Sequence, residues 1–162
     1  MIKKNILFVC LGNICRSPMA EFIFRQMAEE QGVGILFGCD SAGTSDEERG
    51  NPLYSPARKK LAEKGISCEG HRARQVKKAD YDRYDMIIGM DEQNVSDMKA
   101  LFGGDPQAKV SMLLDHTSSC DLAHHGRAVA DPWYTRDFDT AYNDIEVGCK
   151  ALLEELRQMS SQ

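Results

Sequence analysis

The N-terminal segment of the chain joins an apolar strand pattern to a short polar loop and then to a helical pattern. Residues 6–9 are apolar and favour a strand, residues 10–17 follow without a break, and from Pro18 onward apolar residues recur at helical spacing. The sequence therefore predicts a buried strand that ends at Cys10, a loop over residues 11–16 and a helix behind it. Such a start is typical of a parallel α/β sheet.

Strand and helix patterns alternate along the rest of the chain. Four segments are expected to form strands: residues 5–9, 35–39, 85–90 and 109–113. The strongest helical pattern is C-terminal, where apolar residues recur every three or four positions: Phe138, Ala141, Tyr142, Ile145, Cys149, Leu152, Leu153 and Leu156. The alternation predicts an α/β fold with a doubly wound parallel sheet and helices on both faces. The length of 162 residues fits one domain, residues 1–162.

Two strand ends are expected to meet at one edge of this sheet. Cys10 ends the first strand, and Asp91 follows the third. In open parallel sheets, ligands bind beyond the carboxyl ends of the strands, where the strand order reverses. The sheet rule therefore predicts a site that contains both residues.

The loop after the first strand has the chemistry of an anion site. Backbone N–H groups and a helix N-terminus attract a small anion, and the same field favours the thiolate of Cys10. Arg16 offers a planar fork that can hold two phosphate oxygens. Ser17 has two possible roles, to cap the helix or to donate its hydroxyl to the sulfur. A nucleophilic sulfur in such a loop predicts phosphoryl transfer through a cysteinyl-phosphate.

Asp131 is the candidate proton donor for the leaving oxygen. Pro132 follows it, which favours extended geometry at the aspartate and stiffens the loop. In the second step the same carboxylate is expected to activate water. Trp133 and Tyr134 are expected to form one wall of the pocket and Leu11 the opposite side, which leaves a flat apolar slot for an aryl group.

Five segments resemble the low-molecular-weight protein tyrosine phosphatases. Residues 9–21 are similar to the signature on which that family opens, and they are the most specific match. The other segments fall in the family's order and spacing: residues 41–44, 71–75, 90–91 and 131–134. The likeness covers nearly the whole chain. It implies the strand order 2-1-3-4 and hydrolysis of phosphotyrosine in proteins, or of other aryl phosphates, without a metal or organic cofactor.

The resemblance also implies roles for residues around the thiol. The phosphate is expected to be bound by one run of the loop and by the helix start: Leu11, Gly12, Asn13, Ile14, Cys15 and Ser17. Ser17 is implied to help the sulfur leave when the phosphoenzyme breaks down. A network of Asn13 with Ser41 and His71 is implied to brace the loop. Cys15 is implied to form a disulfide with the nucleophile under oxidation, which shields it from overoxidation.

The segment after residue 44 departs from better-known family members, which often carry an aromatic residue there. This chain has four charged residues instead: Asp46, Glu47, Glu48 and Arg49. We therefore expect a slot that is more open and more acidic on one side. This leaves the preference between phosphotyrosine and phosphoarginine open.

Two other functions share parts of this pattern. Thioredoxin-coupled arsenate reductases have the same fold and cysteine loop, but they need two further cysteines after the third strand, and residues 81–99 contain none. A non-catalytic phosphate-binding module or thiol sensor could dispense with the acid, so the presence of Asp131 argues against it. Nucleotide-binding glycine motifs are absent from the sequence.

Composition narrows the partners and the compartment. The net charge of −5 and the pI near 5.4 disfavour nucleic acid. No apolar run is long enough to cross a bilayer, and the N-terminus lacks a secretory signal, so we expect a cytoplasmic protein without a membrane partner. Six cysteines at irregular spacing fit that compartment. Cys120 with His124 and His125 is a poor candidate for a metal site, because no fourth ligand is evident. The oligomeric state stays open.

Overall fold

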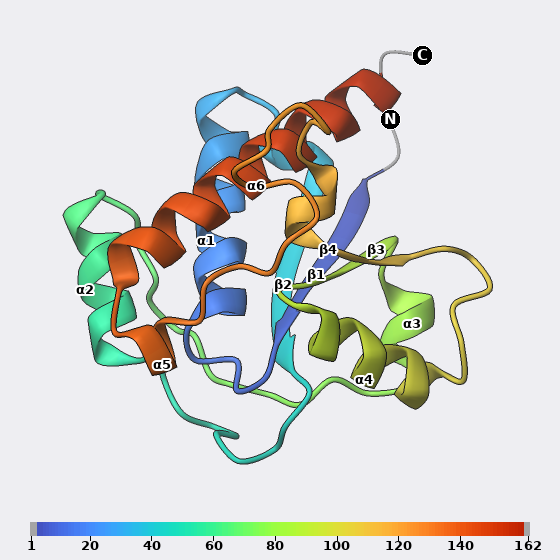
Figure 1. Ribbon diagram of the computed structural model, residues 1–162, viewed down its shortest axis with the longest axis horizontal. Coiled ribbons are helices and arrows are strands. Elements are labelled where there is room, and N and C mark those ends of the chain that lie inside the picture. The colour runs from blue at the N-terminus through green and yellow to red at the C-terminus, as the bar shows by residue number, and fades with distance from the viewer. Residues whose placement is uncertain (1–2, 161–162) are drawn as a thin grey trace.

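The computed structural model describes residues 3–160 and shows a four-stranded parallel sheet in the order β2-β1-β3-β4 (Figure 1). The strands are β1 (Lys4–Cys10), β2 (Phe37–Gly43), β3 (Met86–Gly89) and β4 (Val110–Met112). The helices are α1 (Arg16–Glu30), α2 (Ser55–Glu63), α3 (Asp80–Arg83), α4 (Glu92–Phe102), α5 (Pro132–Thr135) and α6 (Phe138–Ser160), with 3₁₀ turns η1 (Gly34–Leu36) and η2 (Leu113–His116). The expected fold class and strand order are confirmed.

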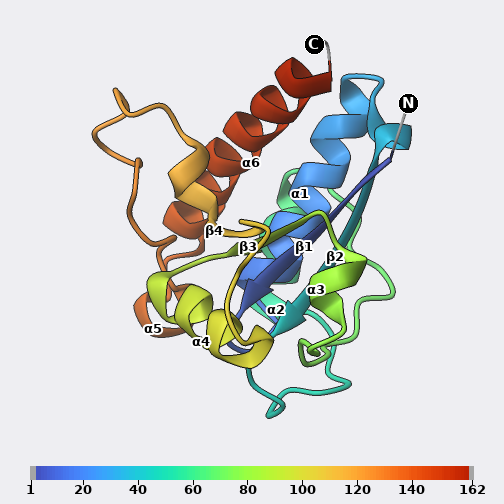
Figure 2. The same cartoon turned by 90° about the vertical axis from the view of Figure 1, so that its right-hand side faces the viewer.

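Strand β1 is apolar on both faces because helices cover both sides of the sheet. Ile6 and Phe8 pack with residues of α1, α2 and α6, whereas Leu7 and Val9 pack with residues of α3 and α4. Figure 2 shows α1 and α6 on one side of the sheet and α3 and α4 on the other. This alternation follows from the two-residue period of a strand.

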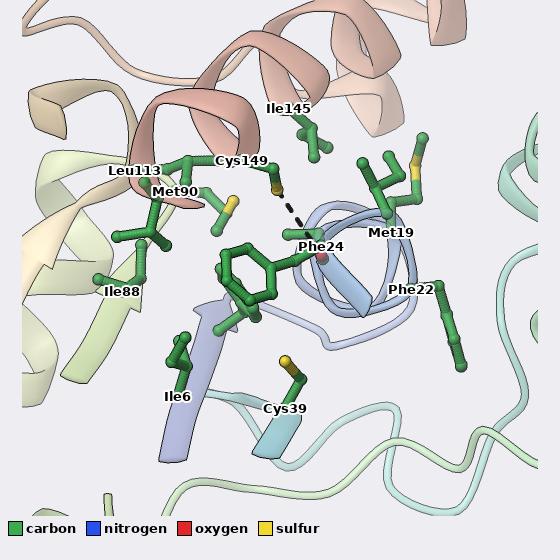
Figure 3. Close-up of a cluster of buried hydrophobic side chains, with 14 of the residues drawn as sticks. Ile6, Met19, Phe22, Phe24, Cys39, Ile88, Met90, Leu113, Ile145 and Cys149 are labelled. Carbon is green, nitrogen blue, oxygen red and sulfur yellow. Dashed lines mark hydrogen bonds between the residues drawn. The ribbon is translucent and has the colours of Figure 1, made fainter. Parts of the chain in front are cut away.

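Helix α6 packs along α1 through the apolar stripe expected from the sequence. Seven of its eight predicted positions are buried: Ala141, Tyr142, Ile145, Cys149, Leu152, Leu153 and Leu156. The eighth, Phe138, is partly buried against the same core. Figure 3 shows Cys149 pointing at α1, where its Sγ donates to the carbonyl oxygen of Ala20 at 3.7 Å. The predicted core face of this helix is therefore confirmed.

The second strand begins and ends later than the sequence predicts. Residues 35–39 were expected to form it, but Gly34–Leu36 is a 3₁₀ turn, Ile35 is exposed, and the strand runs from Phe37 to Gly43. Pairing with β1 extends the strand, because Gly43 lies opposite Cys10 in the register. Helices α2, α3 and α5 were not expected, since they are short and carry little periodicity.

Within residues 3–160, no helix has both the length and the apolar character that a membrane crossing requires. The acidic segment after residue 45 and the segment over residues 118–126 form turns rather than regular elements.

Candidate active site

The loop that leads from β1 into α1 is anchored on the end of β2. The N–H groups of Thr44 and Ser45 donate to the carbonyl oxygens of Cys10 and Leu11, each at 2.9 Å. The contact requires a glycine at position 43, because a Cβ there would lie 2.7 Å from the Leu11 carbonyl oxygen. These contacts therefore fix the position of the loop relative to the end of β2.

The Cys10 sulfur lies within this loop, in contact with a hydroxyl and with a backbone N–H. The Ser17 hydroxyl is 2.9 Å from Sγ, and the backbone N–H of Asn13 donates to Sγ at 3.3 Å. Helix α1 has Cys15 as its N-cap, without a side-chain cap bond. Of its two possible roles, Ser17 therefore takes the contact with sulfur rather than the cap. The Asn13 N–H can stabilise negative charge on the sulfur, and the Ser17 hydroxyl can do so when it donates to a thiolate.

Asn13 shapes the loop and is itself held from behind. Its φ of 59° is left-handed, a conformation that asparagine tolerates. Its side-chain amide donates to Ser17 Oγ at 2.9 Å, and its carbonyl oxygen accepts from His71 Nε2 at 2.7 Å. Ser41 bonds differently from the expected network, because its hydroxyl donates to Glu21 Oε1 at 2.7 Å. Glu21 is buried and was missed by the sequence reasoning.

Arg16 is 4% exposed and lies between two carboxylates. Its Nη2 is 3.0 Å from Asp91 Oδ2 and 3.3 Å from Asp131 Oδ2, while Nη1 donates to the Val129 carbonyl oxygen at 3.2 Å. The sheet rule placed Asp91 at this edge but did not assign it a partner. Asp91 also caps α4, since its Oδ1 accepts from the Asn94 N–H. The arginine is therefore aimed by contacts that are remote in sequence.

Asp131 precedes α5 and faces the cysteine loop. Its Oδ1 accepts from the N–H of Trp133 at 3.1 Å, which leaves Oδ2 beside Arg16. Figure 1 shows α5 next to the blue loop between β1 and α1. The Trp133 ring packs against Tyr54 with a centroid separation of 5.0 Å. Tyr54 was not among the expected site residues, because nothing in its local sequence distinguishes it from a surface aromatic.

One cavity of about 170 Å³ gathers most of the expected residues. Its lining comes from the loop between β1 and α1, from residues 131–134 and from the segment after β2: Cys10, Leu11, Gly12, Ile14, Cys15, Arg16, Ser45, Glu47, Glu48, Asp131, Trp133 and Tyr134. Asn13, Ser17, Ser41 and His71 are buried behind it. The lining thus combines a thiol and a guanidinium with two aromatic side chains and three carboxylates.

The two loop cysteines differ in their surroundings. Burial, followed by the negative charges of Cys10 and Asp131, raises the pKa of the Cys15 thiol to about 12. Cys15 is therefore a protonated thiol at neutral pH. All six cysteines are free in the structure. Over residues 3–160 no group of three metal-ligating side chains comes together, and His124 bonds Asp121 instead.

A thiol, an arginine and a carboxylate thus line one pocket at the carboxyl edge of a parallel sheet, and these are the groups that a cysteine-based phosphoryl-transfer site requires. The family model for low molecular weight phosphotyrosine protein phosphatases matches residues 5–162. The chain belongs to this family and is a hydrolase of the protein-tyrosine-phosphatase class.

Relatives and solved structures agree with this assignment. The chain is 40% identical over 154 residues to the low molecular weight protein-tyrosine-phosphatase YfkJ of Bacillus subtilis, covering 95% of this chain and 96% of that protein. It is 37% identical to the human low molecular weight phosphotyrosine protein phosphatase, covering 94% and 95%. The crystal structure of the Bacillus protein superimposes with a TM-score of 0.91, at 39% identity and 98% coverage of each chain. A Drosophila arginine phosphatase has a TM-score of 0.81 at 26% identity, covering 93% and 96%.

Proposed function

We propose that the protein hydrolyses aryl phosphate monoesters, phosphotyrosine above all, with Cys10 as nucleophile, Arg16 as phosphate ligand and Asp131 as general acid and base. One observation supports this most strongly: all three side chains line one pocket, and Arg16 and Asp131 are 3.3 Å apart. A phosphoryl group on the sulfur would lie beside both the guanidinium and the carboxyl group.

In the first step the Cys10 thiolate attacks phosphorus, the S–P bond forms and the P–O bond to the aryl group breaks. Asp131 gives its proton to the departing oxygen, which leaves as a phenol. Arg16 and the loop N–H groups hold the equatorial oxygens as charge redistributes among them.

In the second step the Asp131 carboxylate takes a proton from water while the water oxygen attacks phosphorus. The S–P bond breaks, phosphate leaves and the thiolate is restored. The Ser17 hydroxyl, at 2.9 Å, stabilises the sulfur as it departs. Each step needs a proton donor or acceptor at the same place, which a single carboxyl group supplies.

The pocket favours an aromatic leaving group of limited size. Trp133, Tyr134 and Leu11 all contribute apolar surface to its lining. A volume near 170 Å³ is smaller than the roughly 300–1,000 Å³ that encloses a whole drug-sized ligand. We therefore infer that the phosphoryl group and the ring enter, while the rest of a phosphoprotein stays outside.

Phosphoarginine is the second candidate substrate, and the acidic rim favours it. Glu47 and Glu48 line the pocket, and a phosphorylated guanidino group keeps a positive charge that these carboxylates would attract. Steady-state rates on matched phosphotyrosine and phosphoarginine peptides decide between the two substrates. If phosphoarginine is preferred, replacing both glutamates with glutamine should lower its kcat/KM more than that of phosphotyrosine.

Cys15 is proposed to protect the nucleophile against peroxide. Hydrogen peroxide converts the Cys10 thiolate to a sulfenic acid, and the Cys15 thiol then displaces water from that sulfur to form a disulfide. Part of the raised pKa of Cys15 comes from the Cys10 charge, and the sulfenic acid removes that charge. Peroxide treatment of Cys15→Ser should therefore give more irreversibly oxidised Cys10 by mass spectrometry. Equal amounts in both proteins would refute this role.

Replacement of single sulfur atoms tests the nucleophile. Cys10→Ser should fold, bind vanadate or phosphate and lose turnover, because an alcohol at this position is a far weaker nucleophile. Cys15→Ser is the matched control, since it changes the other loop thiol but keeps the backbone N–H of residue 15, and it should therefore still form the phosphoenzyme. Turnover by Cys10→Ser would refute the assignment.

Leaving groups of different basicity test the acid. Asp131→Ala should slow phenyl phosphate about 100-fold or more, because phenolate leaves poorly without a proton, and p-nitrophenyl phosphate much less. Equal slowing of both substrates would show that Asp131 is not the acid.

We further infer that the protein acts in the cytoplasm. Six free cysteines, one of them the proposed nucleophile, suit a compartment that keeps thiols reduced.

A further inference from the structure

The segment that precedes Asp131 is bound by a buried carboxylate on α6. Asp144 is 1% exposed and lies one residue before the core position Ile145. Its Oδ2 accepts from the backbone N–H of Ala130 at 3.0 Å. Figure 1 shows this orange segment running beside α6 before it reaches α5. The backbone next to the proposed acid is thus held by a side chain from another element.

Arg127 fixes the orientation of that carboxylate. Its two terminal nitrogens donate to the two Asp144 oxygens at 2.9 Å and 2.8 Å, a bidentate pair. The same guanidinium also donates to the carbonyl oxygens of Ala123 and Ala128 at 2.6 Å and 2.9 Å. His124 Nε2 lies 3.8 Å from Asp144 Oδ1. Arg127 thus links two parts of the segment, at residues 123 and 128, to each other and to α6.

The opposite side of the same segment is bound to the sheet edge. The Val129 N–H donates to the Met90 carbonyl oxygen at 2.9 Å, and its carbonyl oxygen accepts from Arg16. Val129 is 1% exposed in the main core. Residues 129 and 130 are therefore held from opposite sides, and Asp131 is the next residue along the chain.

A carboxylate at position 144 is costly unless it has such partners. Burial alone would raise the pKa of Asp144, but hydrogen bonds from Arg127 and the Ala130 N–H, together with the Arg127 charge, outweigh burial and lower it. The apolar stripe of α6 packs without this residue, so packing does not require an aspartate here. Its hydrogen bonds go to the segment before Asp131.

We propose that Asp144, oriented by Arg127, is a positioning residue that holds the Ala130 backbone so that the Asp131 carboxyl group meets the leaving oxygen. The inference rests on the proposed role of Asp131 as the acid. A general acid works only within hydrogen-bond reach of the oxygen it protonates, and displacement by about 1 Å can cost about 100-fold in rate.

Arg127→Ala is the first test, because its half-exposed side chain can be removed without leaving a cavity in the core. The readout is kcat/KM, which reports the steps through phosphoenzyme formation. For phenyl phosphate we expect a loss of about 10-fold to 100-fold, and for p-nitrophenyl phosphate less than about 3-fold. Vanadate inhibition should be unchanged. Arg127→Lys should recover part of the loss, since an ammonium can still bond one carboxylate oxygen.

Arg74→Ala is the matched control. Arg74 also binds a buried aspartate, Asp80, through two nitrogens at 3.0 Å and 3.4 Å, and the substitution keeps the backbone N–H of residue 74, which donates to Asn13 Oδ1 at 3.0 Å. Its loss should lower stability in a similar way without changing the ratio of the two substrates. A similar ratio change in Arg74→Ala and Arg127→Ala would mean that general loosening is the cause and would overturn the proposal.

Two further variants separate the inference from the function on which it rests. Asp144→Asn should change the substrate ratio in the same direction as Arg127→Ala; if neither variant changes it while Asp131→Ala does, the positioning role is refuted. If Asp131→Ala itself slows both substrates equally, the proposed acid is wrong. The variants with folded circular dichroism spectra are the ones to compare.

Discussion

The cysteine loop and the segment over residues 129–131 line the same pocket, but the contacts around the proposed nucleophile are more local than those around the proposed acid. The contacts of the Cys10 sulfur and of the Asn13 side chain with Ser17 lie within residues 10–17. The acid segment over residues 129–131 instead depends on Met90, Arg16 and Asp144, which are remote in sequence. A local constellation can be recognised from a sequence motif, whereas a segment held by distant partners can be recognised only once they are placed.

Among the variants that test this comparison, Arg16→Lys should have the largest effect, because it removes the guanidinium that contacts both Asp91 and Asp131. A lysine keeps the charge but cannot hold two phosphate oxygens and two carboxylates in a plane. We expect kcat/KM to fall about 100-fold to 1,000-fold, as for loss of one preorganised donor to a transition state. Steady-state kinetics on p-nitrophenyl phosphate measures it. A loss under about 5-fold would show that charge alone is sufficient.

Gly43→Ala tests whether the cysteine loop depends on its close backbone contact with the end of β2. The added Cβ would lie 2.7 Å from the Leu11 carbonyl oxygen, so the loop must shift. Phosphate or vanadate affinity should fall about 10-fold, in line with the sensitivity of bound geometry to small displacements. Gly34→Ala is the control, because its closest neighbour is the flexible side chain of Glu29. Unchanged phosphate or vanadate affinity in Gly43→Ala would show that this close contact does not determine the geometry of the loop.

Trp133→Ala tests the aromatic wall beside the acid. The ring is partly exposed and packs against Tyr54, so its removal should spare the fold. We expect KM for aryl phosphates to rise about 3-fold to 10-fold, the value of one aromatic contact, with little change for an alkyl phosphate. Equal changes in KM for both substrates would show that Trp133 does not cause a preference for aryl phosphates.

The smallest expected effect is on the pH dependence of stability. The pKa of Asp144 is lowered in the folded protein, so the contribution of its pairing is fully present above the unfolded pKa, about 4, and is lost as the pH falls through the folded pKa. Arg127→Ala should therefore lower the free energy of unfolding at pH 7, because it leaves the buried Asp144 carboxylate without its charged partner, and the loss should become smaller below about pH 4. Urea unfolding at several pH values measures this. If the difference in unfolding free energy between the wild-type protein and Arg127→Ala grew as the pH fell, the pairing of Arg127 with Asp144 would be contradicted.

The sequence sufficed for the fold class and for the expected strand near Cys10, because hydrophobic period and a strand–loop–helix motif are local signals. It missed the end of β2, since pairing of Gly43 with Cys10 overrides the local apolar pattern. Helix α2 was missed because only two of its residues, Ala57 and Leu61, are buried.

The site residues that the sequence identified likewise have local signals, whereas those that it missed depend on contacts remote in sequence. The residues of the cysteine loop were found from the motif, and Asp131 from the aspartate–proline–aromatic run and the resemblance. Glu21 and Asp144 became interpretable only through their partners, whereas the sheet rule had already placed Asp91 at the site and the structure added its partner, Arg16. In the sequence each is an acidic residue on a helix or at its start, where most carboxylates are simply solvated.

Capture of the phosphoenzyme tests the central claim most directly. The protein is mixed with excess p-nitrophenyl phosphate, quenched within milliseconds, digested, and the phosphorylated peptide is sequenced by mass spectrometry under conditions that preserve thiophosphates. We expect the phosphoryl group on Cys10 in the wild-type protein and in Cys15→Ser, and none in Cys10→Ser. A phosphoryl group on any other residue, or full turnover with no covalent intermediate, would contradict the mechanism.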